Sequence, residues 1–424
     1  MTDSRLPGFY KWPVEKRRSV LAELLGRPVD DFGALDPDAL ALALADKLIE
    51  NVVGVLSLPL GIGLNLKVNG TDYLVPMAVE EPSVVAAFSN AAKMARAGGG
   101  FTATCDPSHM IGQLQLCPPD DASARSAEDA LRAGIDRVEA AATDACRPMA
   151  ARGGGLVRTE IRRLTDPDGG PPMVILHVVI DVVDAMGANV VNHVCESTAP
   201  VVTELTGLPV NLRILSNLAA HRLARAQTRI PVEAVGGREV AERIAEADRF
   251  ARLDPFRAAT HNKGLLNGID AVAIATGNDW RSIEAGAHAW AARDGQYRGL
   301  TRWTLEGEHL AGSIELPLAV GTVGGITRSH PSIQLLRELM GVSSARTLSG
   351  IFASVGLAQN LAALRALAAE GIQRGHMALH ARQLALAAGA SPDEVDRVVE
   401  RTLEGGPVSA ERVAHELTKC RGES

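Results

Sequence analysis

One lysine stands apart from the others in this chain. The sequence has seven lysines, and Lys263 is the only one between Lys93 and Lys419, because arginine supplies nearly all of the remaining positive charge. It lies in Thr260-His261-Asn262-Lys263-Gly264, ahead of an apolar run. A lysine can lose its proton or present a compact ammonium group, as an arginine cannot. Beside a substrate carbonyl it would stabilise a developing oxyanion. The alternative is an ordinary lysine on a surface loop.

A carboxylate follows the strand-like segment 271–275, at Asp279 in Thr276-Gly277-Asn278-Asp279-Trp280. An aspartate in this position can cap a helix that starts near Arg281. It can also pair with Lys263 and keep the ammonium group charged and oriented. Both interpretations stay open from the sequence.

Two further carboxylates occur in Glu80-Glu81-Pro82-Ser83, just before a helical pattern. Acidic residues at a helix N-terminus complement the helix dipole without any further function. A carboxylate entering an apolar helix can instead lie in a cavity with a raised pKa, which suits a proton donor. Glu81 is the candidate for that second role.

His376 and His380 are four residues apart, so a helix would place both rings on one face. This spacing occurs in zinc sites, but the chain has no HExxH motif and no third ligand close by in the sequence. We predict no metal here. A general acid on a mobile terminal helix is the functional interpretation, and a pair of surface histidines is the alternative.

Two glycine-containing segments could hold a cofactor. Asp184-Ala185-Met186-Gly187-Ala188-Asn189 ends a strand and opens a helix, where backbone N–H groups could receive a pyrophosphate. Gly321-Thr322-Val323-Gly324-Gly325 is the second segment. Neither matches GxGxxG, so a Rossmann fold is not indicated, and a tight turn is the default interpretation of each.

Composition bounds the class of protein. A length of 424 residues predicts two or three domains. The net charge of −7 and the 3% aromatic content argue against nucleic-acid binding. Five cysteines without a CxxC spacing favour a reducing, cytoplasmic setting. The polar N-terminal residues and the lack of a long apolar run predict no signal peptide and no membrane span.

The pattern of apolar residues predicts an α+β fold. Residues 1–110 and 218–370 should form a large, mainly helical substrate domain, residues 111–217 an inserted cofactor domain, and residues 371–424 a mobile helical flap. The insert reads as βαββαβ, the ferredoxin-like arrangement. We expect its strands at 111–116, 157–164, 173–183 and 210–215, and its helices at 126–150 and 190–205. Elsewhere we expect helices at 13–25, 36–50 and 82–97, a hairpin over 64–75 that turns at Asn69-Gly70, long helices between 219 and 371, and short helices at 374–388, 391–404 and 409–420.

Together these segments resemble 3-hydroxy-3-methylglutaryl-coenzyme A (HMG-CoA) reductase. Glu50-Asn51-Val52-Val53-Gly54 is similar to the family's ENVIG-type segment, Asp184 to Asn189 to its DAMG-N motif, and Gly321 to Gly325 to its GTVGG motif. The resemblance is to the soluble bacterial class, which includes enzymes used for mevalonate breakdown. The four residues that match the family's catalytic residues are Glu81, Lys263, Asp279 and His376.

The resemblance also implies binding residues. The positions that match substrate contacts are Ser83, Arg257, Asn267 and Asn360, of which Arg257 can hold the free carboxylate of the HMG group in bidentate fashion.

The positions that match cofactor contacts are Asp184, Met186, Gly187, Asn189, Asn217, Gly321 and Gly324. Soluble NAD-using relatives carry an aspartate where this chain has Cys146, and the adjacent Arg147 could instead receive a 2′-phosphate. NAD and NADP both stay open, with NAD favoured by the class.

The resemblance implies two hydride transfers that interconvert HMG-CoA and mevalonate plus CoA, through mevaldyl-CoA and mevaldehyde. Lys263 would stabilise the oxyanion, Asp279 would orient it, His376 would protonate the CoA thiolate and Glu81 would donate a proton. The sites would lie at the interface of a homodimer or higher even oligomer, under the flap. The alternatives are a CoA-ester binding protein without chemistry, and a reductase of another acyl-CoA, which would leave Arg257 without an anion.

Overall fold

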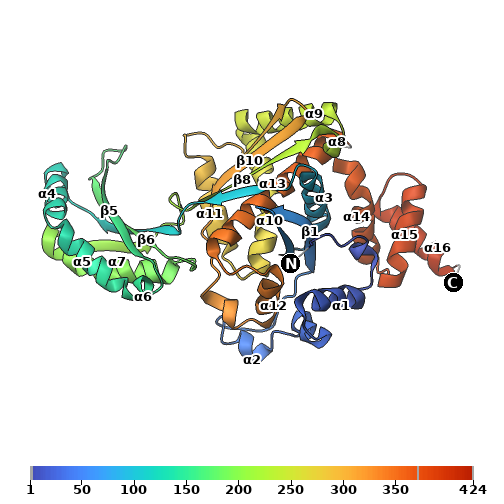
Figure 1. The fold of residues 1–424 in the computed structure, drawn as a ribbon, viewed down its shortest axis with the longest axis horizontal. Coiled ribbons are helices and arrows are strands. Elements are labelled where there is room, and N and C mark those ends of the chain that lie inside the picture. The colour runs from blue at the N-terminus through green and yellow to red at the C-terminus, as the bar shows by residue number, and fades with distance from the viewer. Residues whose placement is uncertain (1–2, 370–371, 423–424) are drawn as a thin grey trace.

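The computed structural model describes residues 3–369 and 372–422, apart from the side chains of Arg328 and residues 372–379. Figure 1 shows a central large domain, a smaller domain that projects from one side, and three helices at the opposite end. The two crossings between the large and small domains lie near residues 106–108 and 216–222. The elements between these crossings, β4 to β7 with their helices, form the smaller domain, and α14 to α16 form the helices at the opposite end.

Two long helices form the centre of the large domain. In α10 (Pro255–Ala275), Pro255 occupies the first turn and the Asp254 carboxylate accepts hydrogen bonds from two backbone N–H groups, so the helix start is capped. The second helix, α13 (Ala345–Ala369), is buried along most of its length. Glycines allow the two helices to pack closely: a Cβ on Gly268 would lie 3.0 Å from Gln359, and one on Gly356 would lie 2.8 Å from Ile269.

Other elements surround these two helices. A hairpin of β1 (Leu60–Val68) and β2 (Thr71–Ala78) turns at Asn69-Gly70 as expected and leads to α3 (Val84–Arg96). The remaining helices of the large domain are α1 (Val14–Leu25), α2 (Leu42–Ala45), α8 (Val232–Val235), α9 (Arg238–Leu253), α11 (Trp280–Ala291), α12 (Pro331–Met340), and the short 3-10 helices η1 (Phe9–Lys11), η2 (Val29–Leu35) and η3 (Gly325–Arg328).

A four-stranded antiparallel sheet in the large domain was not expected. Its order is β3-β8-β10-β9, with bounds Thr102–Cys105, Leu223–Pro231, His309–Pro317 and Thr301–Glu306. Two other expectations are wrong: residues 271–275 continue helix α10, and residues 36–50 form only the short α2 among turns. Short apolar runs fit a buried helix or a buried strand equally well, which is why periodicity misassigned them.

A cross-strand pair explains one glycine of this sheet. Trp303 of β9 lies opposite Gly312 of β10, and its ring is almost wholly buried. A Cβ on Gly312 would lie only 2.2 Å from that ring. The indole N–H donates to the Asn360 side chain of α13 at 2.9 Å, so this pair ties the sheet to the central helix.

The inserted domain has the predicted ferredoxin-like build. Its sheet order is β5-β6-β4-β7, with every neighbouring pair antiparallel. The strands are β4 (His109–Leu116), β5 (Gly155–Leu164), β6 (Met173–Asp181) and β7 (Val210–Leu215). The expected first helix is divided into α4 (Asp121–Ala133), α5 (Ile135–Ala145) and α6 (Arg147–Ala150), and the last helix is α7 (Ala188–Thr206).

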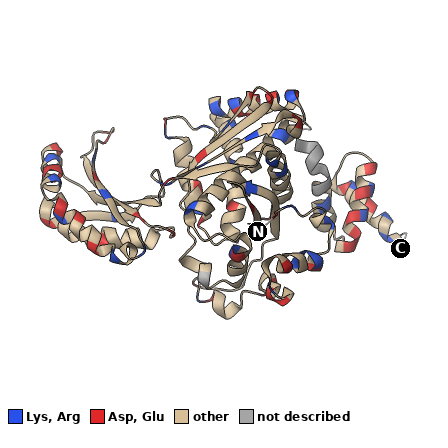
Figure 2. Ribbon diagram, viewed as in Figure 1, with Lys and Arg blue, Asp and Glu red and all other residues tan. Residues whose placement is uncertain are grey.

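Three helices close the chain: α14 (Ile372–Ala387), α15 (Pro392–Glu404) and α16 (Ala410–Gly422). They enclose a small core of their own. Figure 2 shows basic and acidic residues interleaved along α15, α16 and α9. In the part of the chain that the structure describes, α13 is the one helix long and apolar enough to cross a membrane, and 67% of its most apolar window is buried inside the protein.

Candidate active site

Glu81, Lys263 and Asn267 lie together, whereas the carboxylate that the sequence analysis paired with Lys263 was Asp279. The Lys263 ammonium lies 2.7 Å from Oε2 of Glu81, and the Asn267 side-chain amide donates to the same oxygen at 3.3 Å. Lys263 and Asn267 are one turn apart on α10, so they present adjacent side chains. The Lys263 side chain is 62% exposed and Glu81 is 40% exposed, so the pair opens to the surface.

The loop between β2 and α3 positions Glu81 against α10. Ser83 has a φ of 75°, which is uncommon for a residue other than glycine. Such conformations cost of the order of 1–3 kcal/mol and persist where the surroundings enforce them. The loop is also tied to residue 59, because the Val79 N–H donates to the Pro59 carbonyl at 3.1 Å. Ser83 therefore lies two residues from the catalytic candidate, in a strained turn.

Asp279 is not part of that cluster within the chain. Its carboxylate caps α11 by accepting from the N–H groups of Arg281 and Ser282, and it forms an ion pair with the Arg281 side chain at 3.2 Å. Asp279 thus caps a helix, which is the first of the two interpretations given to it from the sequence. Lys263 and the end of α10 at Ala275 are twelve residues apart, or about 18 Å along the helix axis. Asp279 lies beyond that end, so it cannot reach Lys263 of the same chain.

Asp279 lies instead in a pocket with the two glycine segments. The pocket has a volume of about 530 Å³. The N-termini of α7 and α11 both border it, and helix N-termini favour anionic groups. Of the residues expected to bind the cofactor, those that line it are Met186, Gly187, Asn189, Gly321 and Gly324.

The other three cofactor candidates have different places. The Asp184 carboxylate accepts a hydrogen bond from the Ala345 N–H at 2.8 Å, so it caps the start of helix α13 and does not line the pocket. Asn217 is exposed in the segment that returns to the large domain. Arg147 is exposed and ion-paired with Asp144, whereas Cys146 beside it is buried. Arg152, which the sequence reasoning missed, lines the pocket.

The substrate candidates Arg257 and Asn360 are also apart from Lys263. Asn360 is 1% exposed, and its side chain is engaged by Trp303, Thr301 and His261. The structure therefore gives it a role in the buried core, which its sequence position did not reveal.

Arg257 lies in the first turn of α10, half-buried, and burial lowers its pKa. Within residues 3–369 and 372–422 its guanidinium has no carboxylate partner.

His376 is the proposed general acid. His376 falls in α14, but its side chain lies outside the described residues. Its companion His380 is exposed. Among the side chains that the structure does describe, no group of three His, Cys, Asp or Glu residues could hold a metal ion.

A buried pair of acids that the sequence did not reveal joins α10 to α11. Asp270 lies one turn beyond Asn267 and faces Glu284 of α11. Burial first, and then the Glu284 charge, raises the pKa of Asp270 to about 8. The Asp270 carboxyl group is therefore mostly protonated at neutral pH, because burial and the neighbouring carboxylate both disfavour its charged form.

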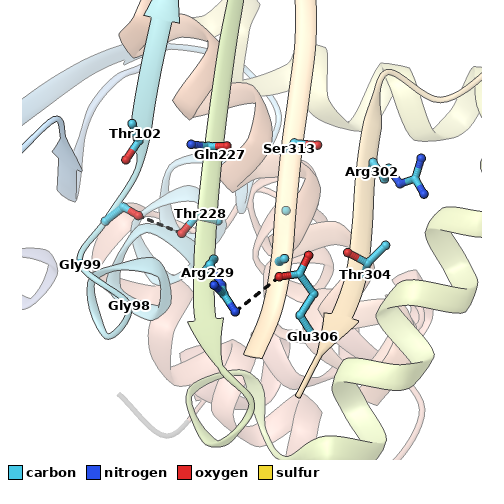
Figure 3. A pocket seen from close by; sticks show the side chains of 13 residues that line it. Gly98, Gly99, Thr102, Gln227, Thr228, Arg229, Arg302, Thr304, Glu306 and Ser313 are labelled. Atoms are coloured by element: carbon cyan, nitrogen blue, oxygen red, sulfur yellow. Dashed lines mark hydrogen bonds and ion pairs between the residues drawn. The ribbon is translucent and has the colours of Figure 1, made fainter. Parts of the chain in front are cut away.

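A larger open pocket lies on the outer face of the large-domain sheet. Figure 3 shows Arg229, Arg302 and Glu306 there among threonine and serine side chains, with the Arg229 guanidinium 3.4 Å from Glu306. None of the residues expected to act in catalysis or binding lines it. Most of the described candidates that face solvent thus lie in one of two places, the Glu81 cluster or the pocket that contains Asp279.

The architecture defines a class before any comparison. The inserted domain lacks the parallel βαβ units of a Rossmann fold, yet it presents a helix N-terminus to a pocket of cofactor size. With an ammonium–carboxylate pair elsewhere on the chain, these features fit an α+β enzyme that holds a cofactor outside a Rossmann fold.

Comparisons with known proteins give the family. Residues 13–381 match the family model of hydroxymethylglutaryl-coenzyme A reductase. The chain is 49% identical to the 3-hydroxy-3-methylglutaryl-coenzyme A reductase of Archaeoglobus fulgidus, over 99% of this chain and 95% of that protein. It is similar to the solved structure of the Streptococcus pneumoniae enzyme, with 42% identity, a TM-score of 0.82, and coverage of 98% and 99% of the two chains. A class II enzyme of that species bound to NADPH in open conformations matches with a TM-score of 0.80 and 42% identity, over 97% of this chain and all of that one. The chain belongs to the hydroxymethylglutaryl-coenzyme A reductase family.

The acid pair makes a prediction about pH. The folded-state pKa of Asp270 lies above the ordinary value of 3.8, so the native protein binds more protons than the unfolded chain between about pH 4 and pH 8. The contribution of this group to the free energy of unfolding should fall as pH rises through that window, by at most about 1.4 kcal/mol per pH unit. Asp270→Asn cannot ionise, so its urea unfolding between pH 5 and pH 8 should lose this slope.

The exposed Asp294→Asn is the matched control and should keep the wild-type pH dependence. A slope that is the same in wild type and Asp270→Asn would show that the pKa of Asp270 is not raised in the folded protein.

Proposed function

We propose that this protein interconverts HMG-CoA and mevalonate plus CoA by two successive hydride transfers. The observation that carries the proposal is the 2.7 Å contact between the Lys263 ammonium and Glu81, formed by residues 182 positions apart. A nicotinamide cofactor in the pocket beside Asp279 would supply the hydride. In the reductive direction two reduced cofactors and two protons convert the thioester to an alcohol and release the CoA thiol.

The chain's own residues would manage charge and protons. Lys263 is charged beside a carboxylate and would stabilise the oxyanion that forms at the substrate carbonyl in each step. Glu81 would pass a proton to that oxygen, through or beside Lys263. His376 would protonate the departing CoA thiolate, and closure of the C-terminal helices over the site would exclude water.

Arg257 supports a substrate that carries a free carboxylate. Its guanidinium is half-buried, and partial burial of an unpaired cation is unfavourable until an anion binds. The distal carboxylate of the HMG group would provide that anion, with Ser83 and Asn267 contributing around it, while Asn360 would act from the core behind α10. A reductase of another acyl-CoA would leave this cation unpaired, and a CoA-ester binding protein without chemistry would have no use for the Glu81–Lys263 pair.

For the cofactor we propose NADPH in place of the NAD that the class resemblance favoured. Apart from Asp279, which caps α11, no acidic side chain lines the pocket in the described chain, whereas Arg152 contributes a cation. A 2′-phosphate suits such surroundings, and Arg147 lies five residues earlier at the start of α6. The S. pneumoniae homologue bound to NADPH supports the same choice. Mevalonate breakdown as the physiological direction of the reaction stays a prediction.

We further propose that two copies of the chain form each active site. Lys263 and Asp279 lie too far apart to act together within one chain, so a second copy must bring its Asp279 and cofactor pocket to Glu81 and Lys263. The surface beside Glu81 supports this proposal. Val53 is 99% exposed and Leu56 is 90% exposed in a segment that reaches Pro59, the hydrogen-bond partner of Val79. Exposed apolar segments of this kind mark protein interfaces.

A cytoplasmic location is also part of the proposal. All five cysteines are free thiols in the structure. Unpaired thiols are typical of proteins that work in a reducing compartment.

The direct test is the absorbance of reduced nicotinamide, with purified protein, mevalonate and CoA in one direction and HMG-CoA in the other. NADP(H) should give the higher rate, and NAD(H) is run in parallel. A change with NAD(H) alone would overturn the cofactor proposal. No change with either cofactor in either direction would support the binding-protein alternative.

Lys263→Ala should abolish both half-reactions, because each forms an oxyanion at the same carbon. We expect a loss of at least about 100-fold in kcat for HMG-CoA and for mevaldehyde. Lys93→Ala, on a different helix, is the matched control. Substantial mevaldehyde reduction by Lys263→Ala would contradict the role given to this lysine.

Mixed dimers test whether the site is shared. Neither Lys263→Ala nor Asp279→Asn should be active alone, and asparagine preserves the helix cap. A purified heterodimer of the two variants contains one site with both residues intact, so it should regain about half of the wild-type activity. An inactive heterodimer would show that each site lies within one chain.

A further inference from the structure

Arg222 is a buried cation at the point where the chain returns from the inserted domain to the large domain. It is only 3% exposed. Nη1 donates to the carbonyl oxygens of Ala185 and Met186 at 3.1 and 3.2 Å, and Nη2 donates to the Val320 carbonyl at 2.5 Å. The first two carbonyls belong to the segment before α7, and the third precedes Gly321. One guanidinium therefore joins the two glycine segments of the cofactor pocket.

Other bonds complete this junction. The Thr322 N–H donates to the Asp184 carbonyl at 2.8 Å, and the Asn278 side chain accepts from the Gly321 N–H at 2.8 Å. Gly321 has no room for a side chain, because a Cβ would lie 2.6 Å from the Met186 nitrogen. Val183, just before the junction, has a φ of 52°, a conformation that a β-branched residue adopts only when its surroundings enforce it. The junction is therefore a rigid, closely fitted unit.

The positive charge of Arg222 is balanced by two aspartates that do not touch it. Within the described chain no carboxylate forms an ion pair with it, although Asp181 and Asp184 are close enough to act on it. Burial lowers the pKa of Arg222 to about 10, and the two aspartates oppose this effect. The guanidinium is thus still protonated at neutral pH. A planar fork that reaches three carbonyls explains why arginine, and not lysine, suits the position.

We propose that Arg222 is a positioning residue for the cofactor: it holds the N-terminus of α7 and the Gly321–Gly325 segment at the spacing that a bound dinucleotide requires. This inference rests on the proposed function. Because Met186, Gly187, Gly321 and Gly324 line the pocket, a shift at the junction moves its walls directly. The Glu81–Lys263 cluster belongs to other elements and keeps its geometry.

The test is a fluorescence titration of NADPH together with steady-state kinetics on the full-length protein. Arg222→Lys keeps the charge but cannot reach all three carbonyls, and we expect the Kd for NADPH to rise about 10- to 100-fold. The KM for HMG-CoA should change less than about twofold. Arg222→Met also loses the charge and should bind NADPH more weakly than Arg222→Lys. Arg225→Lys, three residues along β8 and paired with Asp106 and Glu315, is the matched control and should behave as wild type.

The outcomes separate this inference from the proposed function. Wild-type protein that neither binds NADPH nor turns over HMG-CoA contradicts the proposed function itself. Active wild type with unchanged NADPH affinity in folded Arg222→Lys overturns the role of Arg222, as does an equal loss of affinity for both ligands.

Should the arginine variants fail to fold, Gly321→Ala probes the same junction by forcing a Cβ against Met186. Selective loss of NADPH affinity then supports the proposal, and unchanged affinity refutes it.

Discussion

The length of helix α10 constrains every other part of the catalytic arrangement. It carries Lys263 and Asn267 on one stripe near its middle and ends at Ala275, just before the segment that holds Asp279. A continuous helix cannot fold back, so Lys263 lies about 18 Å along the axis from the helix end at Ala275, where the Asp279 segment begins. This separation is the reason for the proposal that two copies of the chain form each site. The exposed apolar residues beside Glu81 are explained if a second copy completes each site.

The close packing of α10 on α13 keeps this separation constant. Gly268 and Gly356 allow the helices to approach each other, and the buried network of His261, Thr301 and Asn360 fills the space between α10, α13 and the sheet. Hydrogen bonds between buried side chains help to make an arrangement specific as well as stable. Asn360 thus contributes to the geometry of Lys263 from within the core, whichever substrate contacts form when the site closes.

The inserted domain depends on a different kind of constraint. Two crossings attach it to the large domain, and the pocket that contains Asp279 is built where the two domains meet. Arg222 lies at one of these crossings and bonds to both sides. A hydrogen-bonded junction between domains can be rigid locally while the rest of the inserted domain moves, which would suit an enzyme that must bind and release a cofactor twice in each cycle.

The sequence by itself determined the order of elements in residues 111–217, the hairpin at Asn69-Gly70 and the helices of the C-terminal segment. Each depends on local periodicity and turn residues. It also pointed to Glu81 and Lys263, because a solitary lysine and a carboxylate before Pro82 stand out without any knowledge of contacts. Only the tertiary structure decided that residues 271–275 are helical, that β3, β8, β10 and β9 form a sheet, and that Asp279 is separated from Lys263. Arg222, Arg152 and Asp270 gave no signal in the sequence, because a charged side chain becomes distinctive only when folding removes it from water or directs it at a pocket. Pairing between distant strands, burial and proximity are properties of the folded chain, and local sequence patterns do not encode them separately.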